Sequence, residues 1–299
     1  MHPTALPSKY GIGDFGETSR NFIDFLNESS TNIWQVLPLG LTSLDEFSPY
    51  SSPSSILGNR YLVDIEKLTK YEKIDIVTPQ FSNDFVQYND VYKFKDDIFK
   101  NVSKNINLQD KIFTSFLDDD LIKKHITFLI LKDLNQKSWN EWDNVYQDYS
   151  DDLFDKLIIE NTELVNFHVL TQYEFFNQWK SLKKYANDKN VQILGDIPIY
   201  VNHDSADVWL NKEMFELDET GNMELVSGAV PDSFNTEGQI WGNALYRWDL
   251  HKEDNFKYWK EKLNKSLDLY DYLRIDHFIG FFKYWSIPKG ESALNGYWR

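Results

Sequence analysis

Apolar and polar residues alternate in three short stretches of the chain, at residues 32–39, 191–200 and 270–278. A period of two is typical of β-strands, and proline, glycine or polar residues end each stretch. Long segments separate the three stretches, and crossovers of that length join parallel strands. The pattern therefore predicts an α/β protein. A fourth alternating stretch, at 61–65, is interpreted as a further strand.

A different pattern fills residues 85–185, where glycine and proline are scarce and apolar residues repeat at helical spacing. One such apolar face consists of Val91, Phe94, Ile98 and Val102. Others follow at 121–134 and 167–185. We interpret the stretch at about 66–190 as a mainly helical insertion and assign it no chemistry. A further helix is expected from Lys252 to Leu267.

The candidate nucleophile is Asp276, which directly follows an alternating stretch. In a barrel of parallel strands the active site lies at the carboxyl ends of the strands, so a carboxylate placed there faces the site. Arg274 lies two residues earlier on the same face of the strand and can keep Asp276 charged and oriented. On spacing alone, an ordinary ion pair that closes a strand is the alternative.

Two other positions follow predicted strands in the same way. Asp196 ends an apolar strand and is expected to face the same cleft as Asp276, unless it only binds nearby backbone N–H groups. Tyr50 lies in the serine- and proline-rich loop 48–55, where helix and strand are both disfavoured. Barrel enzymes keep binding groups in such loops, although a solvated turn fits this composition equally well.

Aromatic residues are abundant, with 10 Trp, 17 Tyr and 21 Phe, and many stand in polar sequence. Aromatic rings suit a sugar, which offers apolar C–H faces between its hydroxyl groups; an aromatic core is the alternative. The polar loop 228–243 contains Phe234 and Trp241, and loops of this length in compact domains are usually functional or disordered. We predict that this loop is a lid over an active site.

Two motifs of other site classes are weaker. The three glycines of residues 11–16 match the spacing of a dinucleotide-binding loop, but the prolines before them leave no room for the strand that such a loop requires. His203 and Asp207 stand four residues apart, as two metal ligands on a helix would, without an evident third ligand. Helix capping by Ser205 is the preferred interpretation of this segment.

Charge and composition narrow the classes of partner. The chain carries 31 basic and 47 acidic residues, and a formal net charge of -16 disfavours nucleic acid and anionic lipid. It contains no cysteine, which is consistent with a reducing cytoplasm. Its apolar runs are shorter than the ~20 residues of a membrane span and its first residues lack a signal-peptide pattern, so we expect a cytoplasmic location.

Seven segments carry a resemblance to a known family. They are His2-Pro3-Thr4, Gly11-Ile12-Gly13-Asp14, Leu37-Pro38-Leu39-Gly40, Ser48-Pro49-Tyr50, Gly195-Asp196-Ile197-Pro198-Ile199, Gly238-Gln239-Ile240-Trp241-Gly242-Asn243 and Leu273-Arg274-Ile275-Asp276-His277-Phe278. In their order along the chain these segments resemble the amylomaltases, the 4-alpha-glucanotransferases of glycoside hydrolase family 77, which are related to the alpha-amylases.

The resemblance implies a (β/α)8 TIM-type barrel. It also implies that alpha-1,4-glucan segments are transferred to the 4-hydroxyl of glucose or another glucan by a retaining double displacement. Asp276 matches the catalytic nucleophile of the family and Arg274 its supporting arginine. Substrate-binding positions are matched by Tyr50, Asp196, Phe234, Trp241 and His277. The implied ligand is a maltooligosaccharide or another alpha-1,4-glucan, and the chemistry requires no metal or organic cofactor.

The chain also departs from the family. Three parallel strands are convincing where a barrel needs eight, and the acid/base glutamate of the family has no counterpart in the sequence. Residues 1–299 are therefore expected to form the N-terminal portion of a catalytic barrel, inactive without a C-terminal part. Two alternatives remain, a non-catalytic glucan-binding remnant and a hydrolase of the amylase type.

Overall fold

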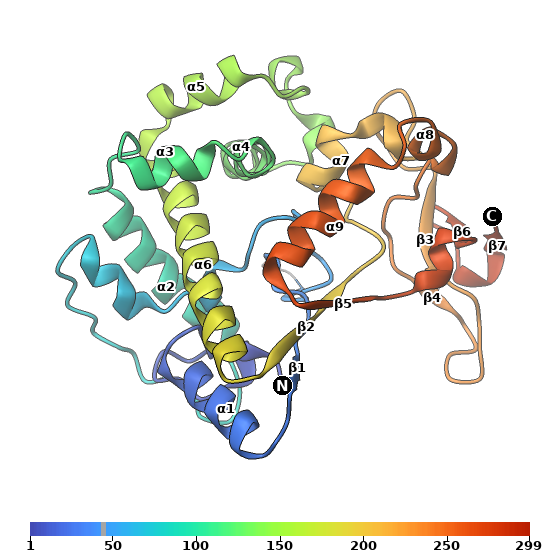
Figure 1. Cartoon of the computed structure of the whole chain (residues 1–299). Coiled ribbons are helices and arrows are strands. Elements are labelled where there is room, and N and C mark those ends of the chain that lie inside the picture. The colour runs from blue at the N-terminus through green and yellow to red at the C-terminus, as the bar shows by residue number, and fades with distance from the viewer. Residues whose placement is uncertain (43–45) are drawn as a thin grey trace.

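Three parallel strands form the centre of the computed structural model, which describes residues 1–42 and 46–299. They are β1 (Ile33–Gln35), β2 (Gln192–Ile197) and β5 (Tyr272–Ile275), in the spatial order β1-β2-β5 (Figure 1). Each lies within one of the alternating stretches, so the prediction of a mixed helix and sheet protein with parallel strands is confirmed. Within the described residues, these three strands do not close a barrel.

Long helices pack against the parallel sheet. Both α6 (Thr162–Asp188) and α9 (Lys257–Leu269) contact β2, and α1 (Glu17–Glu28) packs against α6. Trp179 of α6 donates its indole N–H to the carbonyl oxygen of Leu269 at the end of α9, 2.8 Å away. This bond ties together the two helices that hold β2 in place.

The helices expected between residues 85 and 185 are present. They are α2 (Tyr88–Ser103), α3 (Lys111–Leu117), α4 (Asp120–Asn135), α5 (Asp151–Glu160) and α6. The predicted face of α2 is buried at Val91 and Val102, and α2 packs against α6. We call residues 88–188 the helical region. No helix within the described ranges is both long enough and apolar enough to span a bilayer.

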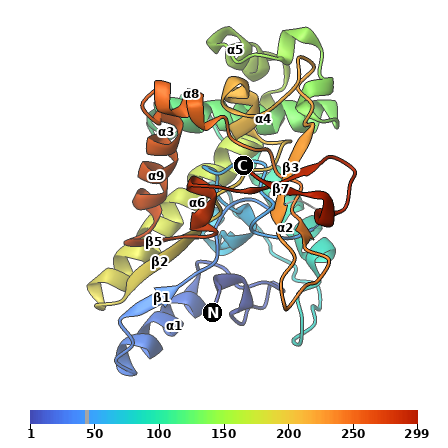
Figure 2. The same cartoon turned by 90° about the vertical axis from the view of Figure 1, so that its right-hand side faces the viewer.

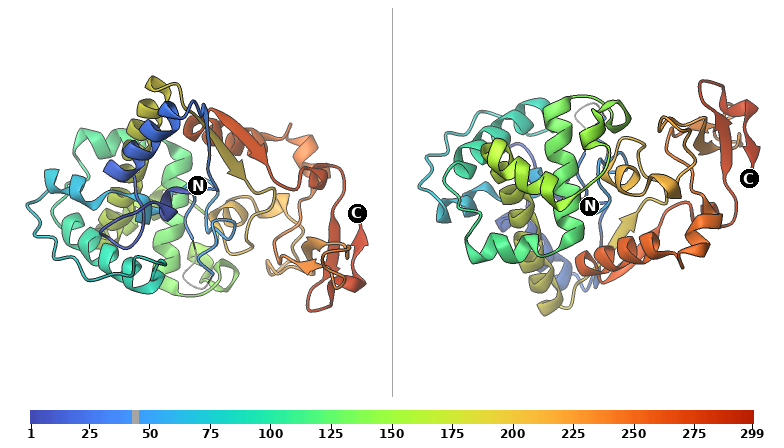
Figure 3. Two further views of the ribbon diagram at one scale, coloured as in Figure 1. Left: turned by 90° about the horizontal axis from the view of Figure 1, so that it is seen from below. Right: turned by 90° about the horizontal axis from the view of Figure 1, so that it is seen from above.

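A second sheet lies at the opposite end of the molecule from the helical region (Figures 1 and 3), and it faces the viewer in Figure 2. Its four antiparallel strands, in the order β4-β3-β6-β7, are β3 (Leu225–Ala229), β4 (Gln239–Ile240), β6 (Trp285–Pro288) and β7 (Tyr297–Trp298). The short helix α7 (Ala206–Leu210) lies between β2 and β3 in the sequence, and the short helix α8 (Trp248–Glu253) lies between β4 and α9. The sequence pattern did not predict this sheet, because two of its strands are only two residues long.

The strand predicted at 61–65 is wrong. The structure has two 3-10 helices there, η2 (Arg60–Leu62) and η3 (Ile65–Lys70). Asn59 and Asp64 precede these helices and accept hydrogen bonds through their side chains from the backbone N–H groups of Tyr61 and Glu66, each 3.0 Å away. Such local bonds give the backbone an alternative to a strand ladder.

The single helix predicted from Lys252 to Leu267 is also corrected. It is two helices, α8 and α9, because Asn255 and Phe256 adopt left-handed backbone angles with φ of 59° and 56°. A right-handed helix cannot continue through such residues.

The glycines at 11–16 serve close packing. The element before them is a 3-10 helix, η1 (Pro3–Ala5), and not the strand that a dinucleotide site requires. A Cβ atom on Gly13 would lie 2.0 Å from the carbonyl oxygen of Pro3. The glycine at this position lets the chain fold back on η1.

Candidate active site

β2 and β5 bring the candidate carboxylates to one end of the parallel sheet. The two strands pair with Asp196 opposite Arg274 and Ile197 opposite Ile275. Asp276 follows at once, and its backbone N–H donates to the carbonyl oxygen of Ile197, 3.1 Å away. Because parallel strands end at the same edge of a sheet, side chains far apart in the sequence meet here.

Arg274 connects the two carboxylates. Its Nη1 donates to Oδ2 of Asp196 at 2.9 Å, and its Nη2 donates to Oδ1 of Asp276 at 2.6 Å. Asp196 is 1% exposed, whereas 43% of the Asp276 side chain is exposed. Charge-assisted bonds to one planar guanidinium fix both carboxylates in orientation and leave Asp276 as the accessible one.

Tyr50 reaches across from its loop to the same cluster. Its hydroxyl donates to Oδ2 of Asp196 at 2.7 Å. Burial, followed by this hydrogen bond, raises the pKa of Tyr50 to about 12. The phenol is therefore a neutral donor near neutral pH, and Asp196 accepts bonds from side chains of two other elements and not merely from neighbouring backbone.

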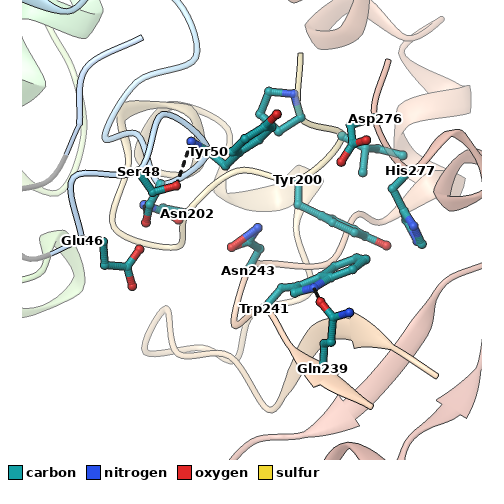
Figure 4. Close-up of a pocket in the computed structure, with 13 residues that line it drawn as sticks. Glu46, Ser48, Tyr50, Tyr200, Asn202, Gln239, Trp241, Asn243, Asp276 and His277 are labelled. Carbon is teal, nitrogen blue, oxygen red and sulfur yellow. Dashed lines mark hydrogen bonds between the residues drawn. The ribbon is translucent and has the colours of Figure 1, made fainter. Parts of the chain in front are cut away.

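A pocket of about 360 Å³ opens in front of these strand ends (Figure 4). Its lining residues are Glu46, Ser48, Tyr50, Ser51, Pro198, Ile199, Tyr200, Asn202, Gln239, Trp241, Asn243, Asp276 and His277. Figure 4 places Asp276 and His277 on one side of the pocket and Ser48 and Glu46 on the other. An aromatic wall with a few polar groups at fixed positions is typical of a small-molecule site.

Three rings form the aromatic wall. Trp241 meets His277 edge to face, with ring centroids 4.7 Å apart and planes at 87°. The centroid of Tyr200 lies 6.0 Å from each of the other two. The indole N–H of Trp241 donates to Oε1 of Gln239 at 3.0 Å, so its own loop fixes the ring.

His277 has an unusual backbone and a neutral ring. Its φ of 51° places a residue with a full side chain in the left-handed region, directly after Asp276. Burial lowers the pKa of His277, although the charge of Asp276 opposes the shift. Strained residues of this kind cluster at functional sites, where the surrounding structure holds them.

Several buried polar atoms around the pocket lack a hydrogen-bond partner. In the part of the chain that the structure describes, these include Oδ1 of Asp196, the hydroxyl of Tyr200 and Nε2 of His277. Buried polar atoms normally have partners, so each exception needs an explanation. A polar ligand or ordered water in the pocket supplies one.

The pair His203 and Asp207 is engaged in other contacts. Nε2 of His203 lies 2.6 Å from the carbonyl oxygen of Gly221, and Asp207 accepts hydrogen bonds from Ser55 and Tyr258. Across residues 1–42 and 46–299, no three His, Asp or Glu side chains gather as metal ligands would. Ser205 caps α7 as expected, since its hydroxyl accepts from the backbone N–H of Val208 at 3.4 Å.

The family model for glycoside hydrolase family 77, described as 4-alpha-glucanotransferase, matches residues 1–299. The chain belongs to this family. Its resemblance to the amylomaltases, inferred above from seven segments, is thereby confirmed.

Relatives of this family 77 chain agree with the assignment. The 4-alpha-glucanotransferase of Clostridium butyricum is 41% identical over 309 residues, which cover 100% of this chain and 63% of the relative. The 4-alpha-glucanotransferase of Aquifex aeolicus is 37% identical over 303 residues, covering 100% of this chain and 62% of the relative. The chain thus spans somewhat over three fifths of the length of these curated relatives.

A solved structure also matches the whole length of this chain. The amylomaltase from Streptococcus agalactiae in complex with acarbose superposes with a TM-score of 0.88 at 36% identity, covering 100% of this chain and 63% of that protein. The amylomaltase from Corynebacterium glutamicum, at 18% identity and a TM-score of 0.77, shares the fold.

The structure places the site residues expected of family 77 at three kinds of position. Those that line the pocket are Tyr50, Trp241, Asp276 and His277. Asp196 and Arg274 lie behind them and hold Tyr50 and Asp276. Phe234, on the loop that also carries Trp241, is 97% exposed and does not line the pocket.

The sequence did not predict most of the residues that line this pocket, among them Tyr200, Asn202, Gln239 and Asn243. Tyr200 and Asn202 follow β2 closely, so the rule that strand ends face the site would have found them. Gln239 and Asn243 flank Trp241 inside a segment already quoted for the resemblance. Small polar residues such as Asn202, Gln239 and Asn243 are common in any loop, so their type alone does not mark a sugar site.

Proposed function

We propose that this family 77 chain carries the nucleophile and much of the sugar cleft of a 4-alpha-glucanotransferase. The enzyme transfers alpha-1,4-glucan segments to the 4-hydroxyl of glucose or another glucan. The observation that carries the proposal is the Arg274–Asp276 pair, 2.6 Å apart, at the mouth of a pocket walled by Trp241.

The proposed reaction is a retaining double displacement. Asp276 attacks the anomeric carbon with one carboxylate oxygen and forms a glycosyl-enzyme, while Arg274 holds the carboxylate in its orientation through a hydrogen bond. A general acid about 5–5.5 Å away protonates the departing 4-oxygen and then takes the proton from the incoming 4-hydroxyl. We assign that role to a glutamate in the C-terminal part of the longer family members, which this chain does not span.

The proposed glucan contacts divide by chemistry. The rings of Tyr50 and Trp241 offer apolar faces to glucose units, and neutral His277 offers a polar edge beside the reacting carbon. Asp196 acts from behind by holding Tyr50 and Arg274. Phe234, at the exposed end of the lid loop, is proposed to meet more distant units of the bound glucan.

The proposed architecture is the N-terminal portion of a TIM-type barrel, with a helical insertion at about 66–190 and an active-site loop at about 228–243. Support comes from the right order of parallel strands and helices and from the partial coverage of longer relatives. On this proposal a C-terminal barrel part is required for turnover, and the enzyme is cytoplasmic.

The test is disproportionation of maltotriose, followed by chromatography. The 299-residue chain is assayed alone and as a fusion to the C-terminal part of the Clostridium butyricum relative that it does not cover. We expect glucose and longer maltodextrins from the fusion only, and none from a fusion carrying Asp276→Asn.

Each competing function gives a different product pattern. Glucan binding without turnover, unaffected by Asp276→Asn, supports a non-catalytic remnant. Free sugar without longer products supports a hydrolase of the amylase type. Transfer by the chain alone contradicts the assignment of the general acid to another part, and Asp196 and Glu237 then become the residues to test.

A further inference from the structure

The loop that carries Tyr50 is held from behind by buried side chains. We define the Tyr50 loop as residues 48–58. Its front half contributes Tyr50 to the pocket, and its back half contains Ser54, which is 0% exposed. Two side chains that meet the back half, His125 of α4 and Asp207 of α7, are 2% and 1% exposed. The described site does not use either of them.

The bond between Ser54 and His125 has a defined direction. Oγ of Ser54 accepts from the backbone N–H groups of Ile56 at 3.2 Å and Leu57 at 3.0 Å. Both acceptor lone pairs of the hydroxyl are then used, so its own proton goes to Nδ1 of His125, 2.7 Å away. His125 must therefore be neutral, with its proton on Nε2. Burial, which lowers the pKa of His125, favours the same state.

A second anchor holds the next residue. Asp207 accepts the backbone N–H of Ser55 through Oδ2 at 2.8 Å, and it accepts the Ser55 hydroxyl through Oδ1. The hydroxyl of Tyr258 donates to the same Oδ1 at 3.0 Å. Beside it, the N–H of Ala206 donates to the carbonyl oxygen of Pro53 at 2.9 Å. The back of the loop is thus fastened to two helices.

The anchors connect to the front of the loop through short bonds. Ser52 donates to the carbonyl oxygen of Ser54 at 2.7 Å, and Asn202 donates to the hydroxyl of Ser51 at 3.1 Å. Hydrogen bonds thus link Ser54 to Ser52, two residues after Tyr50, and hold Ser51 next to it. A nucleophilic role for Ser54 beside His125 does not fit, because its oxygen is buried and already accepts two hydrogen bonds.

We propose that His125 and Asp207 are positioning residues for the sugar site. They hold the Tyr50 loop in the position in which the Tyr50 hydroxyl donates to Asp196 and the Tyr50 ring faces the pocket. The helical region thereby acts on the site through α4, without touching the ligand. The part of this inference that concerns glucan rests on the proposed function.

The first test needs no ligand. His125→Ala removes the acceptor of the Ser54 proton, whereas His125→Asn returns an acceptor near the position of Nδ1. His168→Ala is the matched control, because His168 is 3% exposed in the same region but binds Asp133 at 2.9 Å and not the loop. Amide hydrogen exchange is followed on the peptides that contain residues 48–58.

We expect exchange at Ile56 and Leu57 to be at least about tenfold faster in His125→Ala, equal to wild type in His168→Ala, and near wild type in His125→Asn. Wild-type exchange in a folded His125→Ala overturns the proposal. Should His125→Ala fail to fold, His125→Leu tests the same bond, because leucine fills the space of the imidazole without offering an acceptor to the Ser54 hydroxyl, which still accepts from Ile56 and Leu57.

The second test measures affinity for maltopentaose by calorimetry. We expect about tenfold weaker binding in His125→Ala, recovery in His125→Asn, and no change in His168→Ala. Equal weakening in the two alanine variants indicates a general loss of stability and overturns the positioning role. If the wild-type chain binds no maltopentaose, the variants are compared in the C-terminal fusion described above. If that fusion binds none either, the proposed function is contradicted, and the exchange experiment alone decides whether the anchors hold the loop.

Discussion

Two polar loops meet at the pocket, and they are held in opposite ways. The Tyr50 loop is fastened by buried side chains, among them Gln172 of α6, which binds both the N–H and the carbonyl oxygen of Gly58 at 2.9 Å. The lid loop, residues 228–243, is held at its base by the β3–β4 ladder. At its tip Asp232 accepts from the backbone N–H groups of Phe234 and Asn235 in the same loop, and Phe234 is 97% exposed.

The composition of a loop therefore does not determine how firmly the rest of the protein holds it. Both segments are rich in turn-forming residues and carry an aromatic residue into the pocket. The Tyr50 loop is held in place, because side chains of the three helices α4, α6 and α7 form hydrogen bonds with it. The other is paired at its base through the β3–β4 ladder, and its tip exposes Phe234. Segments of few contacts open at low free energy.

The largest expected effect comes from cutting the deeper anchor. Asp207→Ala leaves Ser55 and Tyr258 without their acceptor and isolates Lys262, whose pKa burial lowers to about 8 despite the charge of Asp207. We expect a loss of about 3–5 kcal/mol in the free energy of unfolding, measured with urea. Asp232→Ala, in the lid loop, is expected to cost about 0.5 kcal/mol. Equal losses would remove the distinction between the loops.

A glycine in each loop gives the next contrast. A Cβ atom on Gly58 would lie 2.0 Å from the ring of Phe175 in α6, so Gly58→Ala should cost about 3 kcal/mol or more. Gly242 has a φ of 76°, and within the described residues no atom lies within 4 Å of its added Cβ. Gly242→Ala should cost about 1 kcal/mol from backbone strain alone. Thermal unfolding of the two variants measures the difference.

For ligand binding, the base of the lid loop should matter more than its tip. Trp241 lines the pocket and is fixed by Gln239, so Trp241→Ala is expected to cost about 2 kcal/mol, or about 30-fold, in affinity for maltopentaose. Gln239→Ala leaves the ring but frees it and should cost less. Calorimetry measures both, and an unchanged affinity in Trp241→Ala would contradict the proposed sugar wall.

A fall in pH is expected to weaken the hydrogen bonds that hold the Tyr50 loop before it affects the lid loop. The pKa of His125 is lowered by burial from its unfolded value near 6.5, so its contribution to stability is full above pH 6.5 and is lost as the pH falls towards the lowered value. His125→Asn should therefore make the decline in stability between pH 7 and 5 shallower. Urea unfolding at both pH values checks this, and parallel declines in the two proteins contradict it.

The smallest effect on stability is expected at the tip of the lid loop. Phe234→Ala should change the free energy of unfolding by less than about 0.5 kcal/mol, because the ring makes almost no buried contact. A larger loss, seen by urea unfolding, would mean that the tip packs against the protein in solution.

The sequence contained the local part of this site. Asp196, Arg274 and Asp276 were found because each stands at the end of an alternating strand, and the resemblance to family 77 then named their roles. The strand predicted at 61–65 failed because two capping side chains outweighed the alternation. Periodicity reports burial, and it carries little information on local competition for backbone hydrogen bonds.

The anchors could not be predicted for a different reason. Ser54 and His125 are 71 residues apart, and Ser55 and Asp207 are 152 apart. Serine in a polar loop and histidine on a helix are both ordinary, so no local pattern marks either pair. Only the packing of α4 and α7 behind the Tyr50 loop brings them together.

The guanidinium that joins Asp196 and Asp276 also sets the local electrostatic field. Two carboxylates share one cation, so this cluster of three side chains carries one negative charge in excess. A sugar ring that becomes cationic as its glycosidic bond breaks meets a counter-charge already in place, without solvent having to reorient. A glucan that carries phosphate groups near the breaking bond meets repulsion instead. On the proposed function, these three side chains are expected to favour a neutral sugar over its phosphorylated form.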